Sequence, residues 1–140
     1  MPALRFADTR ELTYGYAWLI DERRFDELHT IFTPDIRISG PGYVMQSLPD
    51  VVQGMEVLRQ YDRTYHLVGN HLGRWETAEQ FRGETYCTAS HIYLRDGTEW
   101  NYVMAIRYQD IIVRQEGMLR FRERQLRVTF VQDLPLTMAS

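Results

Sequence analysis

The hydrophobic periodicity of this chain changes once, near His66, and that change limits what the chain can fold into. Before His66, apolar residues recur at the three- and four-residue spacing of amphipathic helices. After it, apolar and polar residues alternate with period two, as in half-buried strands. Helices followed by sequential antiparallel strands are typical of an α+β domain, with the helices packed on one side of a curved sheet.

Three helices are expected in the first part of the chain. The segment Asp8-Thr9-Arg10-Glu11 has the residues of a capping box, and Pro34 ends the second helical pattern. The expected helices cover about 8–20, 25–32 and 50–65. A short alternation at Ile36–Ile38 leads into residues 40–49, which are expected to form a loop or flap.

Strands are expected at 66–76, 81–94, 99–115 and 118–131. The pairs Asp96-Gly97 and Glu116-Gly117 are typical hairpin turns between them. A length of 140 residues, 44% of them hydrophobic, fits one domain over residues 1–140 with room for a core and a cavity. The sequence therefore predicts three N-terminal helices on a mostly antiparallel sheet.

Composition excludes several kinds of chemistry. All 16 basic residues are arginine, so Schiff-base enzymes and phosphate loops that need a lysine are excluded. Cys87 is the single cysteine, and neither a metal-ligand motif nor a glycine-rich nucleotide fingerprint occurs. We therefore expect no metal, no cofactor and no internal disulfide.

Charge and hydropathy limit the classes of binding partner that can be expected. The net charge is −3, and the arginines are scattered among acidic residues, so no nucleic-acid partner is expected. Arg120, Arg122 and Arg124 alternate with other residues and are predicted to form a solvated strand face. The N-terminus has no signal-peptide pattern, and no apolar stretch reaches the roughly 18 residues of a membrane span. A cytoplasmic location without membrane attachment is expected.

The histidines are the strongest candidates for catalysis. His66 and His71 would point to opposite faces of a regular strand, so one at most would face a concave interior. His91 follows the small residues Thr85, Cys87 and Ala89 on one strand face, which leaves room for a ligand. Imidazoles in a pocket suit proton abstraction next to a carbonyl or elimination of water, with Asp21 as the candidate carboxylate partner. Histidines that only satisfy buried hydrogen bonds remain the alternative.

Aromatic residues supply candidate substrate contacts. They make up 13% of the chain, and buried tyrosines offer flat apolar surface with a hydrogen-bond donor. Such a lining suits a hydrophobic cyclic or aromatic ligand, although core packing explains tyrosines equally well. The candidate substrate-binding residues are Tyr14, Tyr16, Tyr43, Tyr61 and Asn70, the last of which shares a predicted strand face with His66.

The order of several local strings resembles SnoaL-like proteins of the superfamily named for nuclear transport factor two. These strings are YAWLIDERRFDEL at 16–28, HLVGN at 66–70, GETY at 83–86, RYQD at 107–110 and GMLRF at 117–121. The resemblance implies the cone fold of scytalone dehydratase and ketosteroid isomerase, in which three helices and a strongly bent mixed sheet enclose an apolar pocket.

Within that superfamily, Asp21, His66 and His91 match the Asp and the two His of the scytalone dehydratase-like branch. The resemblance thereby implies a His-Asp general acid/base pair. Two tyrosines of that branch position a water at the substrate carbonyl, and they align with Ile20 and a position near Gly40. The groups that polarise the substrate therefore differ here.

Two classes of function follow. The first is a cofactor-independent lyase, dehydratase-like, or an isomerase, and a polyketide cyclase would use the same pocket. The second is a non-catalytic ligand-binding or assembly module on the same fold. The apolar content of the long final strands, with Trp100, Tyr102 and residues 111–113, predicts a homodimer or homotrimer through the outer face of the sheet.

Overall fold

The computed structural model describes residues 6–137. It contains the helices α1 (Thr9–Asp21) and α2 (Leu48–Met55) and the 3-10 helices η1 (Phe25–Thr30) and η2 (Glu56–Gln60). The strands are β1 (Phe32–Gly40), β2 (Tyr43–Gln46), β3 (Arg63–Trp75), β4 (Gln80–Arg95), β5 (Thr98–Gln115) and β6 (Met118–Pro135). No helix within residues 6–137 is long and apolar enough to cross a membrane.

The first helix begins and faces the core as the sequence predicts. The Asp8 carboxylate accepts a hydrogen bond from the Glu11 backbone N–H, and the Glu11 carboxylate reaches back to the N–H of Ala7. Leu12, Tyr16 and other apolar residues of α1 are buried against the sheet. This packing brings Asp21, at the C-terminal end of α1, to the side of β3.

The other two expected helices are shorter than the sequence predicts. The second is only the 3-10 turn η1, because Phe32 already pairs in β1. The third ends as an α-helix at Met55 and continues as η2 only to Gln60. Residues 63–65 belong to β3 because Thr64 pairs opposite His91 of β4, and these sheet hydrogen bonds override the helical spacing of the sequence.

The six strands form one open, mixed sheet in the order β2-β1-β6-β5-β4-β3. Only β1 and β6 run parallel; every other neighbouring pair is antiparallel. Asp96-Gly97 and Glu116-Gly117 form two-residue hairpins with positive φ at all four residues, as predicted. The region expected to be a loop instead contributes β2, which pairs with a β1 that extends well beyond Ile36–Ile38.

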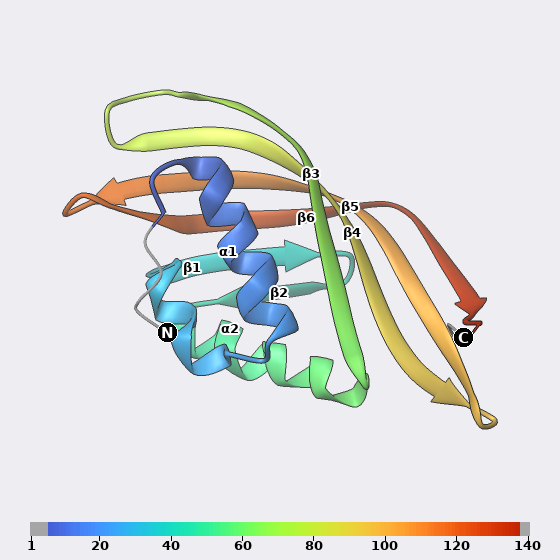
Figure 1. Ribbon diagram of the computed structural model, residues 1–140. Coiled ribbons are helices and arrows are strands. Elements are labelled where there is room, and N and C mark those ends of the chain that lie inside the picture. The colour runs from blue at the N-terminus through green and yellow to red at the C-terminus, as the bar shows by residue number, and fades with distance from the viewer. Residues whose placement is uncertain (1–5, 138–140) are drawn as a thin grey trace.

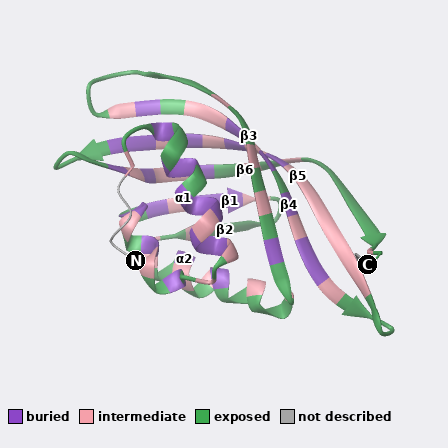
Figure 2. Cartoon of the chain, viewed as in Figure 1, coloured by how far each residue is buried: buried purple, intermediate pink, exposed green. Residues whose placement is uncertain are grey.

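The sheet is strongly bent, and the helices lie on its concave side (Figure 1). The buried residues lie where α1 and the N-terminal strands face the middle of the sheet (Figure 2). In contrast, the C-terminal end of β6 extends beyond the helices and is exposed. The predicted α+β class with helices on one side of a curved sheet is confirmed, with fewer full α-helices than expected.

Two bulges change which side chains face inward. On β3, Val68 pairs with Cys87 and His71 with Thr85, so β3 contains one extra residue. The expectation that the two β3 histidines point oppositely is therefore wrong, because His71 contacts Thr85 on the inner face.

The second bulge lies on β6. There, Phe121 and Glu123 pair with the consecutive residues Ile112 and Ile111 of β5. Arg124 is therefore turned to the inner face, where it is only 1% exposed. The expectation of a fully solvated arginine face is wrong at this position.

Candidate active site

A cavity of about 460 Å³ lies between the helices and the concave side of the sheet. Its lining is mostly apolar and aromatic, and His66 and His91 both reach it. The lining residues are Tyr16, Ile38, Tyr43, Met45, Gly54, Met55, Val57, Leu58, Gln60, Tyr61, His66, His91, Met104, Ile106, Tyr108 and Leu126. Concave apolar sites with a few polar groups are typical of small-molecule binding.

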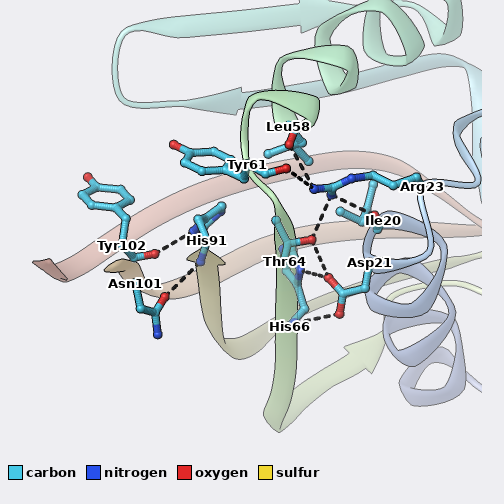
Figure 3. A network of polar contacts seen from close by, with 10 residues as sticks. All are labelled: Ile20, Asp21, Arg23, Leu58, Tyr61, Thr64, His66, His91, Asn101 and Tyr102. Carbon is cyan, nitrogen blue, oxygen red and sulfur yellow. Dashed lines mark hydrogen bonds and ion pairs between the residues drawn. The ribbon is translucent and has the colours of Figure 1, made fainter. Parts of the chain in front are cut away.

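Asp21 and His66 form a hydrogen-bonded pair beside this cavity (Figure 3). Nδ1 of His66 lies 2.7 Å from Oδ1 of Asp21, and the His66 backbone N–H donates to Oδ2 at 2.8 Å. The His66 side chain is 5% exposed and that of Asp21 is 20% exposed. The pair is therefore largely shielded from water.

This contact fixes the tautomer of His66. A carboxylate only accepts hydrogen bonds, so the ring hydrogen of neutral His66 must lie on Nδ1. Nε2 then carries a lone pair, and its ring lines the cavity. A lone pair on a carboxylate-supported imidazole is the arrangement that a general base requires.

Asp21 remains ionised in this setting. Burial by itself raises the pKa of the Asp21 carboxyl, but hydrogen bonds from His66 and Thr64 and the charge of His66 outweigh it. The net effect lowers the pKa below its usual value of 3.8. An ionised Asp21 can stabilise the imidazolium that forms when His66 accepts a proton.

His91, on β4, reaches the same cavity from the neighbouring strand. Its Nδ1 lies 2.9 Å from the carbonyl oxygen of Tyr102, so Nδ1–H donates and Nε2 is an acceptor in the neutral ring. Its ring centroid is 6.2 Å from that of His66. Burial is the main cause that lowers the pKa of His91 below 6.5, so the neutral form predominates near neutral pH.

Three of the five candidate substrate-binding residues line the cavity, and two do not. Tyr16, Tyr43 and Tyr61 lie in its wall. Tyr14 is 47% exposed, because it lies on the side of α1 away from the core, and Asn70 is exposed within the β3 bulge. Neither Tyr14 nor Asn70 is part of the cavity wall.

The cavity tyrosines are hydrogen-bond donors at neutral pH. Burial raises the pKa of Tyr16 to about 12 and also raises the pKa of Tyr43. The Tyr43 ring occupies the space above Gly40, where an added Cβ would lie 2.6 Å from the Tyr43 hydroxyl oxygen. Gly40 thus leaves room for a phenol in the cavity wall.

A buried ion pair lies beneath the cavity. The sequence did not predict it. Arg124 donates to Asp110 from Nε at 2.7 Å and from Nη2 at 3.0 Å. The Arg124 guanidinium carbon lies 3.8 Å from the ring centroid of Tyr108 and 4.4 Å from that of Tyr16. The ion pair therefore supports two aromatic residues of the wall, and only the β6 bulge brings Arg124 to this position.

Thr64 and Arg23 were also missed. Thr64 lies two residues before His66 and so on the same strand face, a signal that could have been used. Arg23 carries no comparable sequence signal. Among residues 6–137, no three or more His, Cys, Asp or Glu side chains gather closely enough to hold a metal ion.

The model of the SnoaL-like domain matches residues 5–125. The chain belongs to the SnoaL-like family. The resemblance noted in the sequence is therefore confirmed, and with it the family of the fold. No curated protein matches this SnoaL-like chain.

Solved structures share the fold of this SnoaL-like protein at low sequence identity. A protein from Novosphingobium aromaticivorans assigned as a scytalone dehydratase superposes with a TM-score of 0.80 at 20% identity, covering 93% of this chain and 87% of the other. A hexachlorocyclohexane dehydrochlorinase from Novosphingobium barchaimii gives 0.78 at 15% identity, covering 89% and 86%. The ActVI-ORFA protein of Streptomyces coelicolor gives 0.73 at 16% identity, covering 88% and 96%.

Proposed function

We propose that this SnoaL-like protein is a cofactor-independent lyase of the dehydratase type. It acts on a hydrophobic cyclic or aromatic small molecule, with His66 as the general base and Asp21 as its orienting partner. The observation that carries the proposal is the Asp21–His66 hydrogen bond of 2.7 Å at the wall of an apolar cavity.

The proposed step is an elimination. Nε2 of His66 takes a proton from the carbon next to a substrate carbonyl, and the electrons of that C–H bond form a C=C bond to the neighbouring carbon. The hydroxyl on that neighbouring carbon leaves with its bonding electrons and takes the proton back from the His66 imidazolium, so that water departs. Asp21 stabilises the imidazolium while it exists.

Other groups of the wall would polarise the substrate. The neutral phenols of Tyr16 and Tyr43 can donate hydrogen bonds to a carbonyl oxygen on which charge develops. His91 would accept a hydrogen bond at Nε2, for example from a substrate hydroxyl. None of the described lining residues is an arginine, aspartate or glutamate, which supports an uncharged substrate.

The structural neighbours favour elimination over isomerisation. Two of them bear the names of elimination enzymes, a dehydratase and a dehydrochlorinase. The elimination proposed here begins with removal of a proton from carbon. An isomerase would share that first step and differ only in where the proton is returned.

The proposal can be tested without knowledge of the natural substrate. The probes are 3-hydroxycyclohexanone and its aryl-substituted analogues, whose elimination gives a conjugated enone that absorbs in the ultraviolet. Exchange of the α-hydrogens of cyclohexanone in D₂O, followed by NMR, reports proton abstraction alone. The wild-type protein is compared with His66→Gln, and with His29→Gln as a control at an exposed histidine.

The outcomes separate the classes of function. Enone formation or α-exchange that is lost in His66→Gln and retained in His29→Gln supports the lyase. Carbon–carbon bond formation on a polyketide-like probe would instead identify a cyclase. Tight binding of the probes with identical background rates in wild-type and His66→Gln protein would identify a ligand-binding module and contradict the catalytic proposal.

A further inference from the structure

Arg23 joins three segments around the Asp21–His66 pair (Figure 3). It follows α1 in a left-handed backbone conformation, with φ of 58°, which a residue other than glycine adopts only when its surroundings hold it there. Its Nη2 donates to the carbonyl oxygens of Leu58 at 3.0 Å and of Tyr61 at 3.3 Å. Its Nη1 donates to Oγ1 of Thr64, on β3, at 3.0 Å.

Thr64 passes this constraint on to Asp21. Its hydroxyl has a single hydrogen, and because Oγ1 accepts from Arg23, that hydrogen is free to point elsewhere. Oδ1 of Asp21 lies 2.9 Å from Oγ1 of Thr64 and accepts a hydrogen bond from this hydroxyl. The hydrogen bonds therefore run in one direction, from Arg23 to Thr64 to Asp21.

Oδ1 of Asp21 thus accepts from two donors, the Thr64 hydroxyl and Nδ1 of His66. Together with the bond from the His66 backbone to Oδ2, these contacts hold the carboxylate in one rotation. Among the described residues, Arg23 makes no ion pair within 4.0 Å with Asp21. The hydrogen-bonded route from Arg23 to the carboxylate runs through Thr64, and the charge of Arg23 acts on Asp21 in addition.

We propose that Thr64 and Arg23 are positioning residues for the general base. They hold the Asp21 carboxylate so that the hydrogen stays on Nδ1 of His66 and the lone pair of Nε2 stays in the cavity. Arg23 also fixes the backbone of Leu58 and Tyr61, whose side chains line the same cavity. The guanidinium of Arg23 thus fixes both the orientation of the proposed base, His66, and the cavity wall beside it. This inference rests on the proposed role of His66 as the base.

The test reads the tautomer of His66 directly. In protein labelled with ¹⁵N-histidine, NMR correlations of the ring nitrogens show which nitrogen carries the hydrogen and how fast it exchanges with water. In the wild type we expect His66 in the Nδ1–H form with a slowly exchanging hydrogen. The isosteric variant Thr64→Val should speed that exchange about tenfold or more and populate the other tautomer, because a hydrogen bond to a charged group is lost. Thr64→Ser should restore the wild-type signal.

Two controls separate positioning from general loss of structure. Thr33→Val removes another buried threonine hydroxyl, one that donates to the Phe121 carbonyl far from Asp21, and should leave the His66 ring unchanged. The ring of His91 serves as an internal control, because its Nδ1–H donates to the Tyr102 carbonyl, a contact that none of these substitutions alters.

Arg23→Met keeps the length of the side chain and removes its donors. It should release the Thr64 hydroxyl and accelerate exchange at His66 in the same direction as Thr64→Val. If Arg23→Met does not fold, the isosteric Thr64→Val variant alone decides the question.

Unchanged exchange and tautomer at His66 in Thr64→Val would overturn the inference. That result leaves the proposed function standing, since the latter fails only if His66→Gln retains elimination and α-exchange. On a probe that the wild type converts, Thr64→Val should lower kcat about tenfold and leave KM nearly unchanged, since no substrate contact is lost. A rise in KM with unchanged kcat would contradict a positioning role.

Discussion

Asp21 accepts two hydrogen bonds from the same residue, His66, one from the ring at 2.7 Å and one from the backbone N–H at 2.8 Å. The backbone contact ties the end of α1 to the start of β3, and the ring contact orients the imidazole. Because one carboxylate makes both contacts, the position of the strand and the direction of the ring are fixed together.

Two substitutions of Asp21 should differ in their effect on stability but have a similar effect on turnover. Asp21→Ala leaves the His66 N–H groups and the Thr64 hydroxyl without their acceptor and should lower the free energy of unfolding by about 1–3 kcal/mol. Asp21→Asn keeps one acceptor oxygen and should cost less, yet turnover should fall roughly 100-fold or more in both variants. Urea denaturation and the elimination assay measure the two effects. Asp26→Ala, at an exposed carboxylate, is the control.

His66→Gln should lower turnover by about 10²–10⁴-fold, the range of general acid/base contributions. The glutamine amide can still donate to Asp21, so the fold should persist with an unchanged far-ultraviolet circular dichroism spectrum. Elimination rates within threefold of wild type in a folded variant would show that His66 is not the base.

Lowering the pH should reduce the free energy of unfolding, because two histidines resist protonation in the folded protein. Burial is the leading cause that lowers the pKa of both His71 and His91 below 6.5, so the unfolded chain binds protons at a higher pH than the folded chain. The stability that these two histidines contribute is present above pH 6.5. It is lost as the pH falls from 6.5 through the lower pKa values that the two rings have in the folded protein. The lowered pKa of Asp21 adds a further loss below pH 3.8.

Urea denaturation at about pH 7.5 and about pH 5 measures this dependence. The free energy of unfolding should be smaller at the lower pH, and His91→Gln, whose amide can donate to the Tyr102 carbonyl, should reduce the difference. Equal stability of the wild type at both pH values would contradict the prediction.

Asp110→Asn should be among the most damaging single substitutions. Arg124 is 1% exposed, and its Nη1 has no hydrogen-bond partner among residues 6–137. Asp110 is the carboxylate that neutralises it. Removing that charge leaves an uncompensated buried cation, for which the expected loss is about 3–5 kcal/mol. Glu99→Gln, which breaks an ion pair with the exposed Arg63, should change little. Thermal denaturation of the two variants compares them directly.

The outer face of the sheet should form a contact between copies of this chain. Tyr65, Leu67 and Leu72 of β3 and Phe130 of β6 are each more than half exposed. Residues 111–113, part of the basis for this prediction in the sequence, do not support it, because Ile112 and Val113 are buried in the core.

Light scattering after size-exclusion chromatography should therefore show a dimer or trimer. Leu67→Arg should shift it toward the monomer, because a charge on a buried contact surface must be desolvated. Tyr14→Arg, at an exposed residue of α1 on the opposite side of the sheet, is the comparison. A wild-type protein that is monomeric at every concentration would contradict the prediction.

The sequence predicts the parts of this molecule that depend on local signals. The capping residues of α1 and the hairpins at Asp96-Gly97 and Glu116-Gly117 are local, and the structure contains all three. The family resemblance gave Asp21, His66 and His91 as a group. The structure places His66 and His91 in the wall of one cavity, with Asp21 hydrogen-bonded to His66. Their roles in catalysis stay predictions.

What the sequence did not predict depends on non-local pairing. The extra residues in β3 and β6 appear only when the partner strand is known, so His71 and Arg124 were expected on the wrong faces. Similarly, the end of the third helix was set by the pairing of Thr64 with β4. The left-handed turn of Arg23 toward Thr64 has no signature in the sequence at all.

The bulge in β3 gives that strand one place where its length can change by a residue without consequence for the interior. Gly69 and Asn70 lie together opposite the single residue Tyr86, so deleting either one would restore regular alternation and leave His71 opposite Thr85 on the inner face. A deletion in a regular part of β3 would instead turn every later side chain to the opposite face. Over evolutionary time, single-residue deletions should therefore be tolerated at this point of the strand and rejected on either side of it.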